Sequence, residues 1–232
     1  LEVRVGIQCH GQGSETTLAQ VAHEILGLDI ESIKIVHGDT ELSPYSTGTW
    51  GSRVMVMSGG AVATACEKLC ERIQLIGAHL LQAELEDTQV EDGYVKAPSG
   101  QISLIDVART WYHRPQDLPA DVDRQGLEVT AGYKLRRDDG TFSYAAHAAV
   151  LAIDPHFGTV EIIRYVVVED GGVLINLMIV DGQILGGAAQ GIGTALYEEM
   201  PFDENGQPLF STLADYVLPG ATEVPNIHIE HM

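Results

Sequence analysis

The sequence has few cysteines and no long apolar run. Its three cysteines, Cys9, Cys66 and Cys70, are too few and too irregularly spaced for a disulfide scaffold, and no Cys-x-x-Cys pair is present to hold a metal cluster. No stretch reaches the roughly 18 uninterrupted apolar residues of a membrane helix, and the first residues lack a signal-peptide pattern. We therefore expect a soluble cytoplasmic protein without a membrane span.

Basic residues are also scarce. Asp and Glu total 33 against 13 Lys and Arg, which gives a formal net charge of −20. Such a chain repels the phosphate backbone, so nucleic acid is a poor candidate partner. A small anionic ligand remains compatible, because the backbone N–H groups at helix starts carry partial positive charge whatever the net charge.

The length of 232 residues and a hydrophobic content of 45% allow a sizeable core, in one large domain or two small intertwined ones. The chain begins inside an alternating strand pattern, Val3, Val5 and Ile7, without an initiator methionine. We expect it to be a piece of a longer protein.

The first part, residues 1–113, alternates strand and helix patterns. Apolar periodicity, caps and turn residues predict, in order, a strand at 2–9, a loop at 10–14, a helix ending at Gly27, a strand at 33–37, a long helix at 57–84, a polar turn region at 89–100 and a short helix capped by Ser103 and ending before Pro115. Residues 114–126, with two prolines and several charges, predict a surface connection.

The second part, residues 127–232, is expected to be richer in strands. β-rich runs at 127–136, 142–153 and 159–168 suggest an antiparallel meander, and extended segments return near Leu209 and Ile227. A glycine-framed helix start is predicted at 186–193, which includes Gln190. Together the two parts predict an α+β fold with mixed or antiparallel sheets packed by long helices.

The first candidate site is the loop Gly11-Gln12-Gly13 before the first helix. Glycines two apart let the backbone approach a ligand closely, and the free N–H groups of the following helix favour an anion. The alternative is a plain turn with Ser14 as the helix cap. Taken alone, the plain turn is the better interpretation.

The second candidate is the small-residue loop 46–53, which includes Thr49, Gly51, Ser52 and Arg53. Such a loop can surround a flat polar ring with backbone groups and set a guanidinium against a phosphate. The alternative is a flexible loop whose arginine pairs with one of the 33 acids.

The third candidate comprises Gly182-Gln183, Gly186-Gly187 and Gln190-Gly191-Ile192-Gly193. The glutamine amide offers two donors and an acceptor, which suits the edge of a heterocycle. The alternative is tight packing of a helix on a sheet, with a surface glutamine. No histidine pair has zinc spacing beside a cysteine or acid, so no direct metal ligand is expected.

The order of these signals along the chain is more specific than any one of them. The pattern comprises Gly11 to Thr17, Gly38-Asp39-Thr40 with Pro44, Gly51-Ser52-Arg53, Ala146-His147, Asp154-Pro155, Val168-Glu169-Asp170, Ile175-Asn176, Gly182-Gln183, Gln190 to Gly193, Glu198-Glu199 and Asp215-Tyr216 with Pro219. This ordered set of motifs resembles the second molybdopterin-binding region in the catalytic subunit of molybdenum hydroxylases. That family includes xanthine dehydrogenase, aldehyde oxidase and the carbon monoxide dehydrogenase large subunit. Its spacing is similar to bacterial members.

The resemblance implies a cofactor site. Gln12 and Gln190 would hydrogen-bond the pterin or the molybdenum's oxo group, while Thr49 and Gly51-Ser52-Arg53 would line the cofactor and its phosphate. Asn176 and Gln183 are further implied contacts. Leu177 departs from the family's usual proline after the asparagine, which puts the shape of that loop in doubt.

Several family features are absent from these 232 residues. They are the Gly-x-Gly-Glu loop with the catalytic glutamate, the first molybdenum-binding region with its Gly-Gly-x-Phe-Gly loop, and cysteines for iron-sulfur centres. The resemblance therefore implies part of a molybdenum-dependent oxidoreductase that hydroxylates an aldehyde, a heterocycle or a similar small molecule with water as the oxygen source. This chain would hold no catalytic residue and would be inactive alone.

The implied cofactor is molybdopterin with molybdenum, in its cytosine dinucleotide form. The implied partners are the rest of the large subunit, an iron-sulfur subunit and a flavin subunit carrying FAD, in a hetero-oligomer. One alternative is a non-catalytic cofactor-binding module that completes a site with a separately encoded partner. A weaker alternative is a dinucleotide-binding domain of another kind.

Overall fold

The computed structural model describes residues 1–120, 122, 125–137 and 141–232. The chain forms two compact units, Leu1–Gly140 and Thr141–Met232. The described residues combine helices with parallel, antiparallel and mixed sheets, so the predicted α+β class is confirmed. The predicted connection 114–126 lies in the first unit, and its positions 121, 123 and 124 lie outside the described residues.

The first unit opens with a strand, a helix and a second strand. β1 (Glu2–Arg4) pairs in parallel with β2 (Lys34–Val36), and α1 (Ser14–Leu26) connects them. α1 ends at Gly27, whose left-handed φ of 62° lets its N–H reach the carbonyl of His23. The predicted order of strand, loop and helix is confirmed, although β1 is shorter than the predicted 2–9. Beyond Arg4 the Val5 N–H still bonds the Val36 carbonyl, and the Gly38 N–H bonds the Ile7 carbonyl, so the two segments stay connected past the end of β1.

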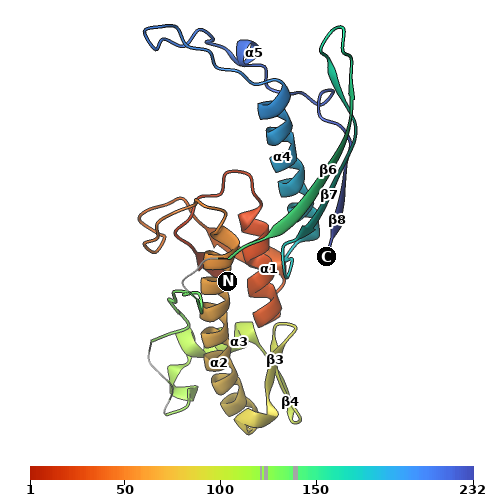
Figure 1. Cartoon of the computed structure of the whole chain (residues 1–232). Helices are drawn as coiled ribbons and strands as arrows, with labels where there is room; N and C mark the ends of the chain where they lie inside the picture. The colour runs from red at the N-terminus through yellow and green to blue at the C-terminus, as the bar shows by residue number, and fades with distance from the viewer. Residues whose placement is uncertain (121, 123–124, 138–140) are drawn as a thin grey trace. The chain divides into compact units, whose positions relative to one another are not determined.

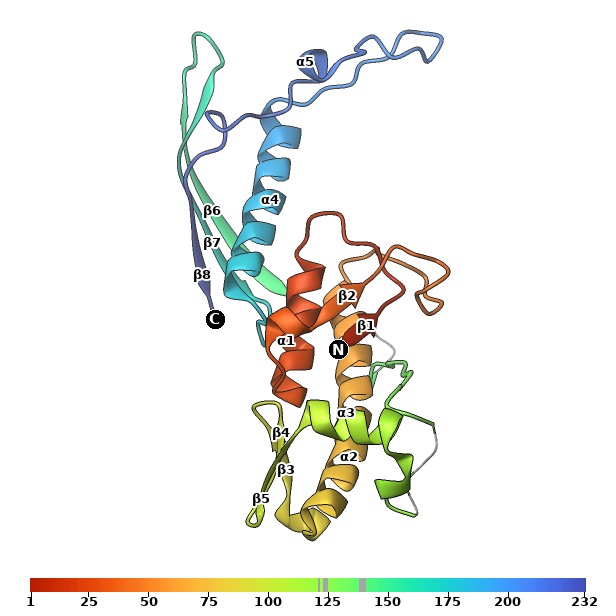
Figure 2. The same ribbon diagram turned by 180° about the vertical axis from the view of Figure 1, so that it is seen from behind.

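The long helix of the first unit lies beside α1 in both views (Figure 1, Figure 2). A π-helical turn at Met55–Gly59 leads into α2 (Gly60–Leu81), which confirms the predicted helix to within a few residues. Its buried face follows helical spacing through Val62, Cys66, Leu69, Ile73 and Ile76.

Residues 89–103 form a small antiparallel sheet of β3 (Gln89–Glu91), β4 (Tyr94–Ala97) and β5 (Gly100–Ser103). The prediction of a plain turn region there was wrong. Asp92 and Gly93, both with positive φ, make the two-residue turn between β3 and β4, and an Asp-Gly pair is a strong hairpin signal. The fully buried Val95 packs on Gly77, where a Cβ would lie 2.5 Å from the valine side chain.

A short helix, α3 (Leu104–His113), follows the sheet. Ser103 caps it as predicted, its hydroxyl accepting the Asp106 N–H at 3.0 Å. The core of the first unit lies between the two long helices, α3 and both small sheets. Its buried members are Val5, Ile7, Leu18, Ala19, Ala22, Leu26, Ile33, Val62, Cys66, Leu69, Ile73, Ile76, Val95, Leu104 and Val107.

The predicted strand at 127–136 was wrong. These residues form no strand, although Leu127 and Val129 pack against the core of the first unit. The Arg72 guanidinium donates to the carbonyls of Gly126 and Glu128, so a side chain satisfies groups that a sheet ladder would otherwise pair. The apolar residues therefore mark a loop that covers the core.

The second unit is built on a three-stranded sheet. β6 (Tyr144–Ile153) and β7 (Val160–Asp170) form the predicted antiparallel pair, and the turn between them closes with the Gly158 N–H on the Asp154 carbonyl at 2.8 Å. β8 (Ile227–His231) runs parallel to β7, so the sheet is mixed rather than a meander. A single-turn helix, α5 (Leu213–Tyr216), lies in the loop before β8, and the predicted extension near Leu209 forms an isolated Phe202–Pro208 bridge instead.

A long helix, α4 (Leu177–Leu196), lies along this sheet (Figure 1). The predicted helix start at 186–193 was wrong, because those residues lie inside α4. The helix begins where the Asn176 side chain accepts the Ile179 N–H at 3.1 Å. Leu177 is its first residue, a position that also accommodates proline, so the departure at Leu177 leaves the helix start intact.

The glycines of α4 explain that error. Glycine costs roughly 1 kcal/mol in a helix interior, so a glycine-rich run predicts a loop. Here the cap and the packing of Ala188 and Ile192 on Val167 and Ile227 hold the helix. None of the helices in the described part of the chain has the length and apolar character that a membrane crossing requires.

Candidate cofactor site

The loop before α1 depends on its two glycines. Gly11 and Gly13 have φ values of 111° and 75°, a region that side chains disfavour. Gly13 is the residue that caps α1, and it has no side chain that could bond the first helical N–H groups. Ser14 is the first helical residue and is buried, so the alternative with Ser14 as cap does not hold. The loop thus places Gln12 and a set of backbone N–H groups at one helix end.

Gln12 is held by one half of its amide. Its Oε1 accepts the His10 N–H at 2.8 Å, which fixes the orientation of the amide group. Its Nε2 is buried and has no hydrogen-bond partner in the described part of the chain. An unsatisfied buried donor costs about 1–3 kcal/mol, which an acceptor on a ligand would offset.

Cys9, which the sequence did not single out as a site residue, lies against the same loop. The Gly11 N–H, with smaller contributions from the N–H groups of Ser14 and Gly13, lowers the pKa of the Cys9 thiol below its ordinary value. The backbone N–H groups of this loop, together with that of Ser14 at the start of α1, therefore favour the thiolate of Cys9.

The second loop is tied to the first through Thr49. Its hydroxyl accepts the Gln8 N–H at 3.0 Å and donates to the Gln8 carbonyl at 2.7 Å. Gly6 brings the same loop close, since a Cβ there would lie 2.3 Å from the Pro44 carbonyl oxygen. The structure thus joins the loop containing Thr49 to the segment that leads into Gln12.

Arg53 ends the second loop, just before the helical run of α2. Its guanidinium donates to the Thr47 hydroxyl and lies 4.4 Å from the centroid of the Trp50 ring. Within the described chain these contacts, rather than a carboxylate, hold it. Its Nε is buried without a partner. Gly51 and Ser52 precede it with left-handed φ values of 62° and 54° and are exposed, so their backbone is accessible.

Three buried side-chain atoms lack a hydrogen-bond partner among the described residues: Gln12 Nε2, Ser43 Oγ and Arg53 Nε. Gln12 and Arg53 belong to these two loops, and Ser43 lies just before the second. Two are donors on predicted site residues, and the hydroxyl of Ser43 can donate or accept. Ser43 carried no sequence signal beyond its place at the start of a small-residue loop. The set fits an oxygen-rich anionic ligand such as a pterin that carries a phosphate.

The remaining predicted residues lie on α4 and at its cap. Gln183 and Gln190 are seven residues apart, so they share one face, and both are exposed. Ala188 and Ile192 lie on the opposite face, against the sheet. A Cβ on Gly182, Gly186, Gly187 or Gly191 would meet nothing within 4 Å. Asn176 caps the helix. Because glycines surround Gln183 and Gln190, their two amides lie on a part of the α4 surface that carries few other side chains.

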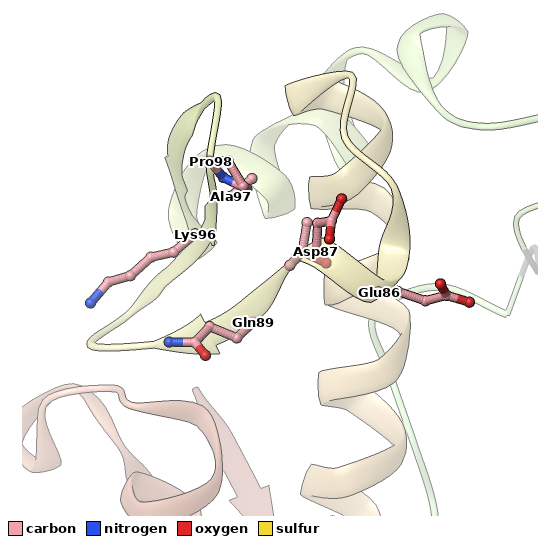
Figure 3. Close-up of a pocket in the computed structure, with 7 residues that line it drawn as sticks. Glu86, Asp87, Gln89, Lys96, Ala97 and Pro98 are labelled. Carbon is pink, nitrogen blue, oxygen red and sulfur yellow. The ribbon is translucent and has the colours of Figure 1, made fainter.

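A surface pocket of about 310 Å³ lies beside β3 and β4 (Figure 3) and contains none of the predicted residues. Glu86 and Asp87 line it, and Lys96 extends away from them to bond Glu91 at 2.7 Å and Asp92 at 2.6 Å. The acidic lining and the neutralised lysine do not suit an anionic cofactor.

The family profile of the molybdopterin cofactor-binding domain matches residues 1–225. The chain belongs to this family, and its relatives include large subunits of molybdenum hydroxylases. It is 38% identical over 227 residues to the 6-hydroxypseudooxynicotine dehydrogenase complex subunit gamma of Paenarthrobacter nicotinovorans, covering 97% of this chain and 28% of that protein. It is 36% identical to the carbon monoxide dehydrogenase large chain of Hydrogenophaga pseudoflava, covering 98% and 28%.

Solved structures agree with this assignment. Quinoline 2-oxidoreductase from Pseudomonas putida 86 superposes with a TM-score of 0.91 at 36% identity, over 100% of this chain and 29% of that one. The chain therefore spans somewhat more than a quarter of the length of these relatives. The family resemblance predicted from the ordered glycine loops is confirmed.

Proposed function

We propose that this chain holds a molybdopterin cofactor with its molybdenum, as part of the catalytic subunit of a molybdenum hydroxylase. The observation that carries the proposal is the pair of buried donors in the loops of Gln12 and Arg53, together with the Ser43 hydroxyl just before the second loop, all without a hydrogen-bond partner among the described residues. When bound, the molybdenum centre supplies the redox chemistry of an oxidoreductase that hydroxylates an aldehyde, heterocycle or similar small molecule.

Each proposed residue has a role that its placement supports. The Gln12 amide donates to the cofactor, and Arg53 neutralises its phosphate from a guanidinium already ordered by Trp50. Gly11, Gly13, Gly51 and Ser52 allow close backbone approach, and Thr49 positions its loop through Gln8. The resemblance adds Asn176, Gln183 and Gln190, of which Asn176 caps α4 and the two glutamines offer amide donors on its exposed face.

The rest of the machinery is proposed to lie outside these residues. The catalytic base, the iron-sulfur clusters and FAD belong to the rest of the large subunit and to partner subunits of a hetero-oligomer. Relatives named as the gamma subunit of a complex and as a large chain support such an assembly. The bacterial sources of those relatives favour the cytosine dinucleotide form of the cofactor. The free Cys9, Cys66 and Cys70 support a cytoplasmic location.

The second candidate is a non-catalytic module that completes a site with a separately encoded partner. The exposed glutamine face of α4 favours this second candidate, because an exposed face needs another surface to enclose a ligand. Both candidates require the same cofactor contacts. They differ in whether one continuous polypeptide carries the catalytic base.

Cofactor content tests the proposal. Arg53→Met and Gln12→Glu are expected to lower molybdenum and pterin content of the complete protein severalfold, because each removes a donor while Gln12→Glu keeps the acceptor for His10. Arg109→Met and Gln89→Glu are matched controls, since both residues are exposed and lie outside the loops. Unchanged content in both loop variants contradicts the proposal.

A further inference from the structure

The second unit contains a three-residue charged cluster at the end of its sheet. His231 on β8 bonds the Glu169 Oε1 on β7 through its Nδ1 at 3.1 Å. Its Nε2 bonds the Asp181 Oδ1 on α4 at 2.8 Å. The side chains of His231 and Glu169 are only 20% and 12% exposed, whereas that of Asp181 is 42% exposed, so the ring is largely enclosed and reaches the partly exposed Asp181 from one side.

The two contacts bear on the charge of the ring. When Glu169 and Asp181 are both ionised, each carboxylate accepts a hydrogen bond and donates none, so each nitrogen of His231 carries a proton. The ring is therefore an imidazolium between two carboxylates on different elements. On β8 itself, Glu230 pairs with His228, so Glu169 and Asp181 are the charged groups that face His231.

Asp181 is the one charged residue in the twenty of α4, and five others are glycine. A helix so rich in glycine has weak intrinsic stability and depends on tertiary contacts. Ala188 and Ile192 anchor its later turns to the sheet. The Asp181 contact anchors the turn just before Gln183.

We propose that the His231 imidazolium is a positioning group that holds the first half of α4 on the sheet and so fixes the outward face bearing Gln183 and Gln190. As far as that face binds cofactor, this inference rests on the proposed function. Asp181 and Gln183 point to roughly opposite sides of the helix, because two residues turn it by about 200°. A roll of α4 after loss of the anchor displaces both glutamines together.

The cluster also makes the anchor sensitive to pH. Asp181 is the largest influence and, with Glu169, raises the pKa of His231 above its ordinary value, although desolvation acts the other way. A raised histidine pKa in the folded state means that the stabilisation is complete below the ordinary value and is lost as pH rises through the raised one.

Hydrogen exchange of peptides covering 177–190, in the complete protein that carries this chain, tests the anchor. After correction for intrinsic rates, we expect protection to fall about tenfold between about pH 6 and about pH 9 in the unmodified protein. His231→Gln loses that protection at both pH values. His228→Gln, a change on the same strand at an exposed pair, keeps the unmodified profile.

Asp181→Asn serves as a second variant if His231→Gln misfolds, and it is expected to remove the pH dependence while leaving the β7–β8 pairing protected. Protection and pH profile unchanged in either folded variant overturn the anchor. Molybdenum and pterin content separates the two claims. Cofactor in the unmodified protein with unaltered exchange in the variants rejects the anchor alone, whereas altered exchange in a protein that never binds cofactor supports the anchor and rejects the proposed function.

Discussion

The two units bury very different amounts of apolar surface. The first unit has a core of fifteen buried hydrophobic residues, whereas the cluster of the second has four, Val167, Ala188, Ile192 and Ile227. All ten residues of β6 are exposed, as are Met178 and Ile163 nearby in the same unit. The first unit therefore supports its proposed ligand loops with its own core, whereas the second presents α4 on a thin sheet.

Separating the units is the most severe test of this difference. Residues 1–140 expressed alone are expected to unfold cooperatively on heating, because their core is self-contained. Residues 141–232 alone are expected to show a broad transition or none, since four buried residues stabilise little. Circular dichroism against temperature measures both. A sharp transition in the second fragment contradicts the comparison.

Shortening one buried side chain in each core is expected to have the next largest effect on stability. Leu18→Ala is expected to destabilise the first unit by about 2–5 kcal/mol, because Leu18 is fully buried and its neighbours are held by two helices. Ile192→Ala is expected to cost about 2 kcal/mol, at the lower end, because the sparse cluster can close around the cavity. Denaturant unfolding of the complete protein measures both. Equal losses remove the distinction.

Substitution of one glycine in each unit is expected to have opposite effects on stability. Gly6→Val forces a side chain against the Pro44 carbonyl and is expected to cost about 1–3 kcal/mol and to release cofactor by shifting the Thr49 loop. Gly182→Ala meets nothing and is expected to stabilise α4 by about 0.5–1 kcal/mol. Thermal unfolding and molybdenum content check both. A stable, fully loaded Gly6→Val protein is incompatible with the loop arrangement described.

The smallest expected effect is a difference in alkylation rate between two cysteines of the first unit. The loop N–H groups lower the pKa of Cys9, whereas burial raises that of Cys66 to about 11 and also raises that of Cys70. In cofactor-free protein at neutral pH, Cys9 is therefore expected to react with iodoacetamide at least about tenfold faster than Cys66. Peptide mass spectrometry gives the rates. Faster labelling of Cys66 is the contrary result.

The sequence predicts those parts whose signals are local. The long helix, the Ser103 cap and the β6–β7 pair follow from periodicity, a hydroxyl before a helix, and alternation, and all three are present. The family follows from glycine loops in a fixed order. The roles of individual site residues stay predictions until a cofactor-bound structure is examined.

The failures arise where tertiary contacts override local preference. The glycines around Gln190 predict a loop, yet packing on the sheet and the Asn176 cap keep them helical. The 127–136 run predicts a strand, yet Arg72 takes carbonyls that a ladder would use. Ser43 and Cys9 were missed as site residues because the first is distinguished only by an unpartnered hydroxyl and the second by converging backbone donors.

A crystal or cryo-EM structure of the complete cofactor-loaded protein shows directly whether Gln12 and Arg53 hold the cofactor. We expect acceptor atoms of the pterin or its phosphate within about 2.7–3.2 Å of Gln12 Nε2 and Arg53 Nε, the two donors without partners among the described residues. We also expect the Gln190 amide at the cofactor. A cofactor seated elsewhere, with protein groups bonded to both of those donors, contradicts the proposed function.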